Sequence, residues 1–526
     1  MKKFIRICAI LLAVTMLFAS VGCDNSKTSS DSQTSVQSQE NQGGTGFDIG
    51  DVNATQGATQ NSGGDGTGGT TTNAGINYDN VMNIEGDIKE NSKYPGRVTD
   101  LHGKTIRCQF WQPYMSGIST DYPTLSKKFK ELCDNIGKQL NCKVVMVEGW
   151  SNESGPQIDA SIAAGKPSVD IWWVNTAKFD AAYRNGYLTD LSSLKVFDFQ
   201  DRSRFSHATE MCNVGGKYYG VAPRTYGKIP VFTNMVLYAN VDLLEDVGVP
   251  LSDLIKWQDN KEWTWSKFRE VCQKVKENNG KNGYATYAVN DCNSEFYVDL
   301  LIANGTDWIE RDPNDTTKFK FTGGSKAGQN VLKFYSQLYK DGYLRFDEDF
   351  DQGTQFKNNQ IAFYGGAMSK LTTEAGHWKI NYAVMYPPIG DDVDDYVTAG
   401  HQFSFACIPK GKKPSGATDA EIATVLNLIN TGLLTKEEDT AQLYSDLSFS
   451  IKNQLTNKTC MSIYNQPQKI AWSMMAYGLG LADLGGRGGW YGKVHEIAEA
   501  GGTNITSILN EVTPGYDAKL SGIYNK

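Results

Sequence analysis

The histidine, serine and carboxylate residues of this 526-residue chain do not form any of the common catalytic motifs. Its five histidines are too far apart to place two zinc ligands one helical turn from each other, and His495-Glu496 lacks the second histidine of an HExxH site. Neither a GxSxG nucleophile motif nor a GxxxxGK[ST] phosphate loop occurs. The sequence therefore predicts no catalytic residue of these motif-defined classes.

One acidic run, Asp347-x-Asp349-x-Asp351, has the beginning of a calcium-binding loop. Gln352 occupies the position of the turn glycine and Asn358 that of the final glutamate, so we predict a solvated acidic loop and no metal. Two carboxylates for glycoside hydrolysis can come from distant positions, and 59 Asp and Glu residues offer no way to choose them. A glycan hydrolase therefore stays open as an alternative.

Two predicted strands, 105–111 and 169–174, carry tryptophan at or near their carboxyl ends and are followed by polar residues. The second run is almost continuously apolar, which is typical of a strand buried on both faces of a parallel sheet. Ligands of open α/β sheets bind at the carboxyl ends of the strands. Both strand ends are therefore candidate binding positions.

The segments around these strands have helical periodicity. Apolar residues in 123–140 recur at three- and four-residue steps, and Pro123 suits a first helical position. A strand follows at 142–147, and helices flank the strand at 169–174, the first of them ending at Gly165. Alternating strands and helices predict an α/β fold with a mainly parallel sheet.

Two stretches resemble bacterial extracellular solute-binding proteins of the group that contains maltose-binding protein. The first runs from Gly165-Lys-Pro-x-x-Asp-Ile through an aromatic pair to a helix ending Asn185-Gly-Tyr-Leu-x-Asp-Leu. The second runs from Gly215-Gly-Lys-Tyr-Tyr-Gly-Val-Ala-Pro to Val236-Leu-Tyr-Ala-Asn-x-Asp-Leu-Leu, where that family has its first crossover between lobes. The resemblance covers 104–526 and implies a two-lobe, type II periplasmic-binding-protein-like fold with discontinuous lobes joined by a hinge.

The start of the chain is predicted to be a targeting signal and a tether. Residues 1–22 have a basic start and an apolar run too short for a comfortable membrane span. They resemble a bacterial lipoprotein signal that ends before a lipid-modified Cys23, although Ser20 stands where leucine is commonest; a plain secretory signal is the alternative. Residues 23–95 are rich in Ser, Gly, Thr and Asn, which predicts a disordered tether.

The resemblance divides the remaining chain between the two lobes. The expected segments are lobe 1 at 96–232, lobe 2 at 233–400, a return segment of lobe 1 at 401–460, and the rest of lobe 2 at 461–526.

The charge of the chain bears on its partners, and the spacing of its cysteines bears on disulfide formation. The net charge is −8 and the sequence pI is about 5.4, with no basic stripe, so we expect no nucleic-acid partner. Eight cysteines follow Cys8 and Cys23 without CxxC spacing, and we expect buried thiols, with the pairing left open.

In the resembled family the ligand contacts come from both lobes, at strand ends and helix starts. Flat aromatic side chains suit the C–H faces of sugars, and amide, carboxylate and guanidinium groups suit their hydroxyls. Transferred by position, the expected ligand contacts are Trp111, Gln112, Trp173, Asn175, Arg224, Tyr226, Asn234, Glu295, Phe296, Tyr364, His401 and Trp472. Core packing is the alternative for the two tryptophans Trp173 and Trp472, and an ion pair between lobes or plain surface is the alternative for Arg224 and Glu295.

The resemblance thus implies the substrate-binding lipoprotein of an ABC importer, which captures a carbohydrate, above all an oligosaccharide, by hinge closure. We expect a monomer without a cofactor and without enzymatic activity, held at the extracellular face of the cell membrane. Its expected partners are the soluble sugar, the permease subunits, and the lipid bilayer through acylated Cys23. A non-sugar solute such as a peptide or polyamine, a glycan hydrolase, and a glycan adhesin stay open as alternatives.

Overall fold

The protein was analysed as a computed structural model. It describes residues 94–109, 123–147, 154–201, 205, 207–222, 234–278, 287–347, 351–368, 370–373, 378–400, 404–432, 451–465, 469–482 and 487–524. The predicted signal and almost all of the predicted tether lie outside these residues. Within the described part of the chain, no helix has the length and apolar character needed to cross a membrane.

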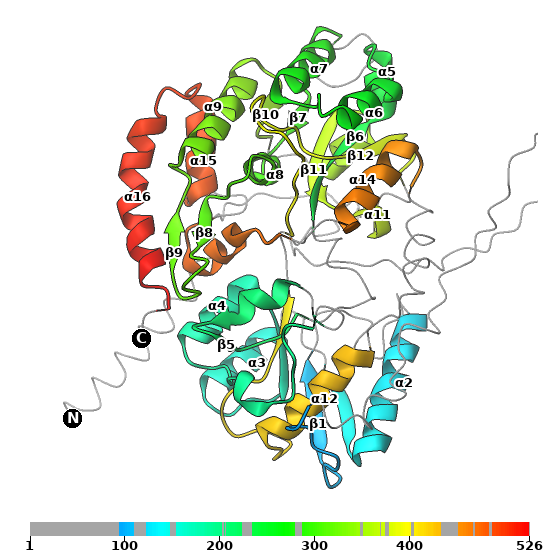
Figure 1. The fold of residues 1–526 in the computed structure, drawn as a ribbon, viewed down its shortest axis with the longest axis vertical. Coiled ribbons are helices and arrows are strands. Elements are labelled where there is room, and N and C mark those ends of the chain that lie inside the picture. The colour runs from blue at the N-terminus through cyan, green and yellow to red at the C-terminus, as the bar shows by residue number, and fades with distance from the viewer. Residues whose placement is uncertain are drawn as a thin grey trace, which may run out of the picture. The chain divides into compact units, whose positions relative to one another are not determined.

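The described residues form an α/β protein with two main sheets (Figure 1). The first sheet has the order β13-β3-β1-β2, with β1, β2 and β3 parallel and β13 antiparallel to β3. Its strands are β1 (Thr105–Gln109), β2 (Lys143–Val147), β3 (Ile171–Asn175) and β13 (Ser404–Cys407). The predicted parallel arrangement is confirmed, and β13 shows that a segment more than 200 residues later completes this sheet.

Helices cover both faces of the first sheet. A two-stranded antiparallel hairpin, β4-β5, follows in the chain. These elements are α2 (Pro123–Leu140), α3 (Ser154–Ala163), α4 (Thr176–Arg184), η3 (Ser192–Leu194), η4 (His207–Cys212), β4 (Asn213–Val214), β5 (Lys217–Tyr218) and α12 (Asp419–Gly432). As predicted, α2 begins at Pro123, and Phe129, Leu132 and Ile136 face the core. Gly165 lies just beyond α3 with a φ of 69°, which agrees with its predicted role at a helix end.

The second sheet has the order β10-β7-β11-β6-β12, with β6 antiparallel to both of its neighbours. Its strands are β6 (Met235–Asn240), β7 (Val289–Asn290), β10 (Leu344–Arg345), β11 (Phe363–Ala367) and β12 (Tyr382–Met385). β7 runs parallel to β10 and β11. All six residues of β6 are buried, because this strand lies between β11 and β12 and is covered on both faces.

The remaining elements surround the second sheet. They are α5 (Val241–Asp246), α6 (Leu251–Asp259), α7 (Trp265–Glu277), α8 (Glu295–Ala303), β8 (Ile309–Arg311), β9 (Phe319–Phe321), α9 (Lys326–Lys340), α10 (Gln352–Lys357), α11 (Lys370–Thr373), α14 (Gln454–Asn465), η8 (Trp472–Leu479), α15 (Trp490–Glu499) and α16 (Ile505–Ser521). α8 has apolar residues on all sides and is buried from Phe296 to Ala303, since α9 and β11 pack around it.

α14 packs against the second sheet, although the first part of this helix was predicted to belong to the first lobe. Thr456 Oγ1 accepts a hydrogen bond from Val384 N at 2.9 Å, and Gln258 Nε2 donates to Thr459 Oγ1 at 2.9 Å. Both threonines are fully buried. Residues 454–460, which the sequence analysis placed in the return segment of the first lobe, therefore pack with the second.

The eight cysteines from Cys108 onward are free thiols in this structure, and six of them are buried. Burial is the main cause that raises the pKa of each of them, to about 11 for Cys142 and Cys292. The expectation of buried thiols is thus confirmed for these six.

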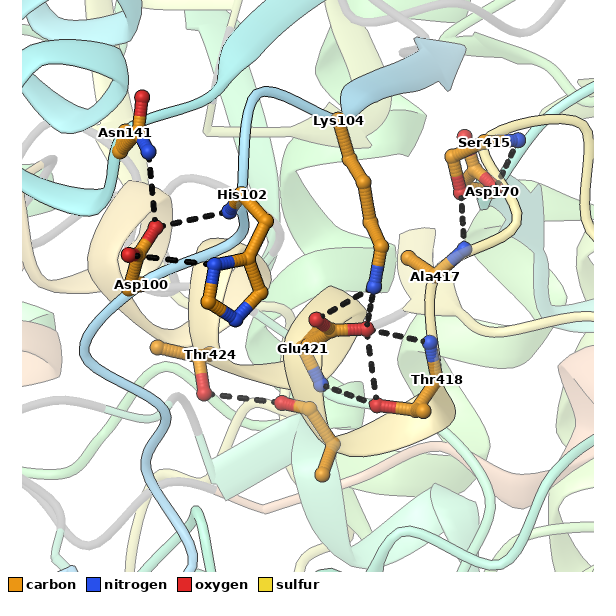
Figure 2. A network of polar contacts seen from close by, with 11 residues as sticks. Asp100, His102, Lys104, Asn141, Asp170, Ser415, Ala417, Thr418, Glu421 and Thr424 are labelled. Carbon is orange, nitrogen blue, oxygen red and sulfur yellow. Dashed lines mark hydrogen bonds and ion pairs between the residues drawn. The ribbon is translucent and has the colours of Figure 1, made fainter.

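A polar network joins the return segment to the first lobe (Figure 2). The buried carboxylate of Asp170 accepts hydrogen bonds from Arg107 N at 2.7 Å and from Ser415 Oγ at 2.6 Å. In the first turn of α12, Glu421 Oε1 lies 2.6 Å from Lys104 Nζ. Glu421 and Thr418 also form a capping box, because each side chain accepts a hydrogen bond from the other residue's backbone N–H. α12 is therefore attached to the beginning of β1 by charge as well as by apolar packing.

Replacing Glu421 by Gln is expected to lower the free energy of unfolding by about 1–2 kcal/mol at pH 7. Burial alone would raise the pKa of the Glu421 carboxyl, but hydrogen bonds from Lys104 and Thr418 outweigh it and hold the pKa below its usual value. The stabilisation is therefore complete above the unfolded-state pKa and is lost as the pH falls through the folded-state pKa. Urea denaturation of both proteins between pH 7 and pH 3 should show the difference shrinking toward acid.

Glu245→Gln, at an exposed position of α5, is the matched control and should change the unfolding free energy by less than about 0.5 kcal/mol. A difference between wild type and E421Q that stays constant down to pH 3 would contradict this role of the Glu421 charge.

Candidate functional site

Two chain segments cross between the sheets, and they pair with each other at both ends of the crossing. At the first sheet, Val221 N donates to Ala406 O at 3.0 Å and Ala406 N donates to Val221 O at 2.8 Å. At the second sheet, Asn234 forms an antiparallel bridge with Gly400. A third segment joins them, since Gly400 also bridges Ile470. The two crossing segments thus pair with each other where they leave each sheet.

The carboxyl edge of the first sheet is built around Gln109 and Asn175. Gln109 ends β1 and is buried, and its Oε1 accepts a hydrogen bond from Trp173 N at 2.9 Å. Asn175 ends β3 half-buried, and its Oδ1 accepts from Lys178 N at 2.9 Å, which caps α4. Ser404 of β13 lies opposite Asn175. This edge is therefore held in place by side-chain hydrogen bonds to backbone N–H groups.

The predicted contact Trp173 lies in the core. Its side chain is 5% exposed and belongs to the cluster of Ile171, Val221 and Ala406. Its neighbour Trp172 is equally buried, on the other face of the sheet. Core packing, the alternative that the sequence left open for Trp173, is therefore its position in this structure, because helices cover both faces of the sheet.

Three predicted contacts of the second lobe are also buried. Asn234 is 3% exposed, and its Nδ2 donates to Thr398 Oγ1 at 2.6 Å. Phe296 is 1% exposed and packs against Phe268, with ring centroids 5.5 Å apart. Tyr364 is 4% exposed and stacks on Tyr238. These three side chains therefore pack inside the second lobe, and almost none of their surface is exposed.

Glu295 is half-buried and begins α8 at the carboxyl end of β7, where the loop is rigidly held. The Asp291 carboxylate accepts hydrogen bonds from Phe296 N and Tyr297 N, both at 3.0 Å, and from Tyr335 Oη at 2.7 Å. Burial nevertheless raises the pKa of Asp291 to about 6. The loop that presents Glu295 is thus fixed to the helix by its own aspartate.

A serine–histidine pair lies behind this loop and bears on the hydrolase alternative. Ser294 has a φ of 58°, and its Oγ lies 3.1 Å from His495 Nε2. Burial lowers the pKa of His495 to about 4, so the imidazole is neutral near pH 7 and stacks on Phe346 at 3.8 Å. Both side chains are buried, Ser294 completely, so this pair presents no surface to a substrate in this structure.

Lys370 is a residue at the second edge that the sequence analysis did not identify. It begins α11, three residues after the end of β11, and its Cε lies 3.0 Å from where a Cβ of Gly366 would be. Its Nζ lies 5.1 Å from the ring centroid of Tyr364. The Gly365-Gly366 pair, with a lysine four residues after it, was the signal in the sequence that could have revealed this arrangement.

Trp472 begins η8 and contacts a cation of the protein itself. The Arg311 guanidinium carbon lies 4.1 Å from the Trp472 ring centroid, and Phe319 makes an edge contact. Arg311 Nη1 also donates to the backbone oxygens of Glu210 at 2.9 Å and Asn213 at 3.1 Å. Arg311 and Trp472 therefore connect β8 of the second lobe with η4 and β4 of the first.

Five predicted contacts and the predicted acylation site lie outside the described residues. They are Trp111, Gln112, Arg224, Tyr226, His401 and Cys23. For the acidic run, Asp349 is outside as well, while Asp351 Oδ2 caps α10 by accepting from Thr354 N at 2.7 Å. Among the residues that the structure describes, no group of three or more His, Cys, Asp or Glu side chains could hold a metal ion.

Replacing Arg311 by Ala is expected to lower the free energy of unfolding by about 1.5–3 kcal/mol, because two backbone carbonyls lose a charged donor and the Trp472 ring loses its cation. Urea denaturation monitored by tryptophan fluorescence measures this change. Lys320→Ala on the neighbouring strand β9 is the control, since the Lys320 side chain is 65% exposed and its ion pair with Glu310 lies at the surface. Equal stability of the two variants would contradict a connecting role for Arg311.

Comparison with known structures supports the fold described above. A sugar transporter protein from Rhizobium etli, solved in an open conformation, is 17% identical with a TM-score of 0.54; the match covers 79% of this chain and 99% of that one. The cyclic α-maltosyl-1,6-maltose binding protein from Arthrobacter globiformis is 14% identical with a TM-score of 0.54, over 80% and 99% of the two chains. The galacto-N-biose/lacto-N-biose I-binding protein of Bifidobacterium longum is 15% identical with a TM-score of 0.50, over 79% and 98%.

These similarities establish an α/β fold of the type II periplasmic-binding-protein-like class with two lobes. Comparison with curated protein sequences gives no match. The family model for bacterial extracellular solute-binding proteins matches residues 125–459, which is more than half of the chain. This protein therefore belongs to the bacterial extracellular solute-binding protein family.

Proposed function

We propose that this protein is the lipid-anchored substrate-binding component of an ABC importer and that its ligand is a soluble carbohydrate, above all an oligosaccharide. The family match over 125–459 is the observation that carries the proposal. Structures with the same fold are described as a sugar transporter, a maltosyl-maltose binding protein and a lacto-N-biose complex. We infer a monomer that binds its ligand without changing it.

The proposed mechanism is hinge closure about the paired crossover strands. Two lobes linked by Val221–Ala406 on one side and Asn234–Gly400 on the other can rotate by small backbone changes between these fixed points. A ligand shifts the equilibrium toward the closed form only through contacts that both lobes make at once. The closed form would then be delivered to the permease subunits.

The proposed ligand contacts lie at the edges of both sheets. From the first lobe, we propose Trp111 and Gln112 after β1 and the half-buried Asn175 after β3. Glu295 at the start of α8 is the counterpart from the second lobe. Arg224, Tyr226 and His401 belong to the crossover segments. The buried Trp173, Asn234, Phe296 and Tyr364 are proposed to hold these contact residues in position. Trp472, next to the crossover segments, is proposed to contact the ligand.

A thermal-shift screen against soluble mono- and oligosaccharides tests the ligand class, because a ligand that binds only the folded protein raises the unfolding midpoint. We expect at least one sugar to raise it, and Trp111→Ala to weaken binding of that sugar at least tenfold, about 1.4 kcal/mol. Isothermal titration of wild type and W111A measures the change.

Trp257→Ala, at a half-buried tryptophan of α6, is the matched control and should bind like wild type. A midpoint raised only by peptides or polyamines would replace the carbohydrate with one of those solutes. Release of cleaved sugar would favour a hydrolase, and binding to insoluble glycan alone would favour an adhesin.

Acylation of Cys23 is a separate expectation, because it concerns location rather than the ligand. We expect the cell-associated protein to carry lipid on Cys23, and Cys23→Ser to be released into the medium with sugar binding unchanged. Intact-mass analysis and cell fractionation provide the measurement. A wild-type protein of unmodified mass that is recovered from the medium would rule out the anchor.

A further inference from the structure

Exposed basic residues gather at the amino edge of the first sheet, where the parallel strands β1, β2 and β3 begin. The candidate ligand site is at the opposite edge, and nothing in the proposed transport mechanism uses the amino edge. It lies at the lower end of the molecule in Figure 1, near α12. We call these residues the basic cluster: Arg107, Lys143, Lys166, Lys410 and Lys412.

Two of the cations belong to neighbouring strands. In the parallel register Lys143 of β2 is the partner of Thr105 in β1, so Lys143 and Arg107 point to the same face of the sheet. Arg107 Nε also donates to Ser168 O at 3.1 Å. The cluster thus extends from β2 across β1 to the turn that precedes β3.

The other three cations come from two loops that pack on each other at this edge. Lys166 lies in the turn before β3, and Lys410 and Lys412 lie in the loop after β13. Lys412 N donates to Gly165 O at 3.2 Å, and a Cβ on Gly411 would clash with the same oxygen. The glycine at 411 therefore allows the two loops, and with them the three lysines, to approach closely.

The carboxylates at the same edge already have partners within the protein. Glu421 and Asp419 are each paired with a lysine outside the cluster, at 2.6 and 3.2 Å. Asp100 and Asp170 accept hydrogen bonds from neighbouring groups, as Figure 2 shows. Among the described residues, no carboxylate forms an ion pair with a member of the basic cluster. On a chain with a net charge of −8, this edge is therefore a local site of attraction for anions.

The predicted tether joins the folded chain close to this edge. The described chain begins at Tyr94 and follows α12, where Val98 N donates to Thr424 Oγ1 at 3.1 Å, before it reaches β1. Roughly 70 residues separate Cys23 from Tyr94, and a flexible chain of that length spans about 45 Å. This length is sufficient for the basic cluster to reach a membrane that holds an acylated Cys23.

We propose that the basic cluster docks on the anionic phospholipid surface of the membrane to which the protein is anchored. The inference rests on the proposed lipoprotein function and adds a contact made by the folded domain itself. Basic side chains are attracted to an anionic lipid surface within a Debye length, about 10 Å at 0.1 M salt. Docking by the amino edge leaves the opposite edge, with the candidate ligand site, directed away from the bilayer.

Vesicle co-sedimentation of the full Cys23→Ser chain recovered from the medium tests this contact, because that protein carries no acyl anchor. We expect it to bind phosphatidylcholine vesicles that contain about 30% phosphatidylglycerol, to ignore pure phosphatidylcholine, and to be released at about 0.5 M salt. Binding to both kinds of vesicle, or to neither at about 0.05 M salt, would overturn the docking surface. Binding to soluble polyphosphate in place of vesicles would also overturn it.

The outcome of this assay is separate from that of the proposed function. If the wild-type protein proves to be unmodified at Cys23, it replaces the Cys23→Ser chain in the same assay. Sugar binding is measured on the same samples, and loss of vesicle binding should leave it unchanged.

Lys166→Glu combined with Lys412→Glu should weaken binding to the anionic vesicles at least tenfold. Lys326→Glu combined with Lys333→Glu is the matched control, because these exposed lysines of α9 lie in the second lobe and change the net charge equally. Equal losses in the two double variants would assign the attraction to net charge and overturn the proposal. Lys410→Gln, a milder change, should weaken binding at least threefold even if the first double variant does not fold.

Discussion

The pairing of the two crossover segments is the constraint on which the rest of the structure depends. Val221 and Ala406 pair at the first sheet, and Asn234 and Gly400 pair at the second. The crossing chain then becomes β6, an interior strand of the second sheet, and returns as β13 at the edge of the first. The second sheet is complete after one crossing, but the first sheet gains β13 only when the chain crosses back, so the folding of the first lobe is tied to that of the second.

Buried carboxylate and amide groups then fix the sheet edges where a ligand is proposed to bind. At these edges Gln109 accepts from the backbone of Trp173 and Asp291 from the first turn of α8. At the amino end of β3, Asp170 accepts from Arg107 and Ser415. A buried acceptor that lost such a donor would cost roughly 1–3 kcal/mol. These bonds therefore hold loops in one conformation, and a preorganised site loses less conformational entropy when it binds.

The two lobes also share apolar contact on one side of the hinge. One buried cluster continues from Phe179 of α4 to Phe319 of β9, and Gly478 of η8 packs so closely on α4 that a Cβ there would lie 2.7 Å from Ala177 O. Arg311, stacked on Trp472 and bonded to first-lobe carbonyls, adds a polar connection at the same place. Contacts this extensive favour a closing motion about this side, because opening it would expose apolar surface.

The sequence by itself determined the local elements and the class of fold. Periodicity and Pro123 located α2, and the apolar run located β3, because these signals depend only on neighbouring residues. Tertiary structure alone decided which tryptophans are core, that 454–460 belong with the second sheet, and that Arg311 covers Trp472. Burial and pairing of this kind depend on residues far apart in the sequence, such as Val384 and Thr456, 72 positions apart, whose approach no local pattern records.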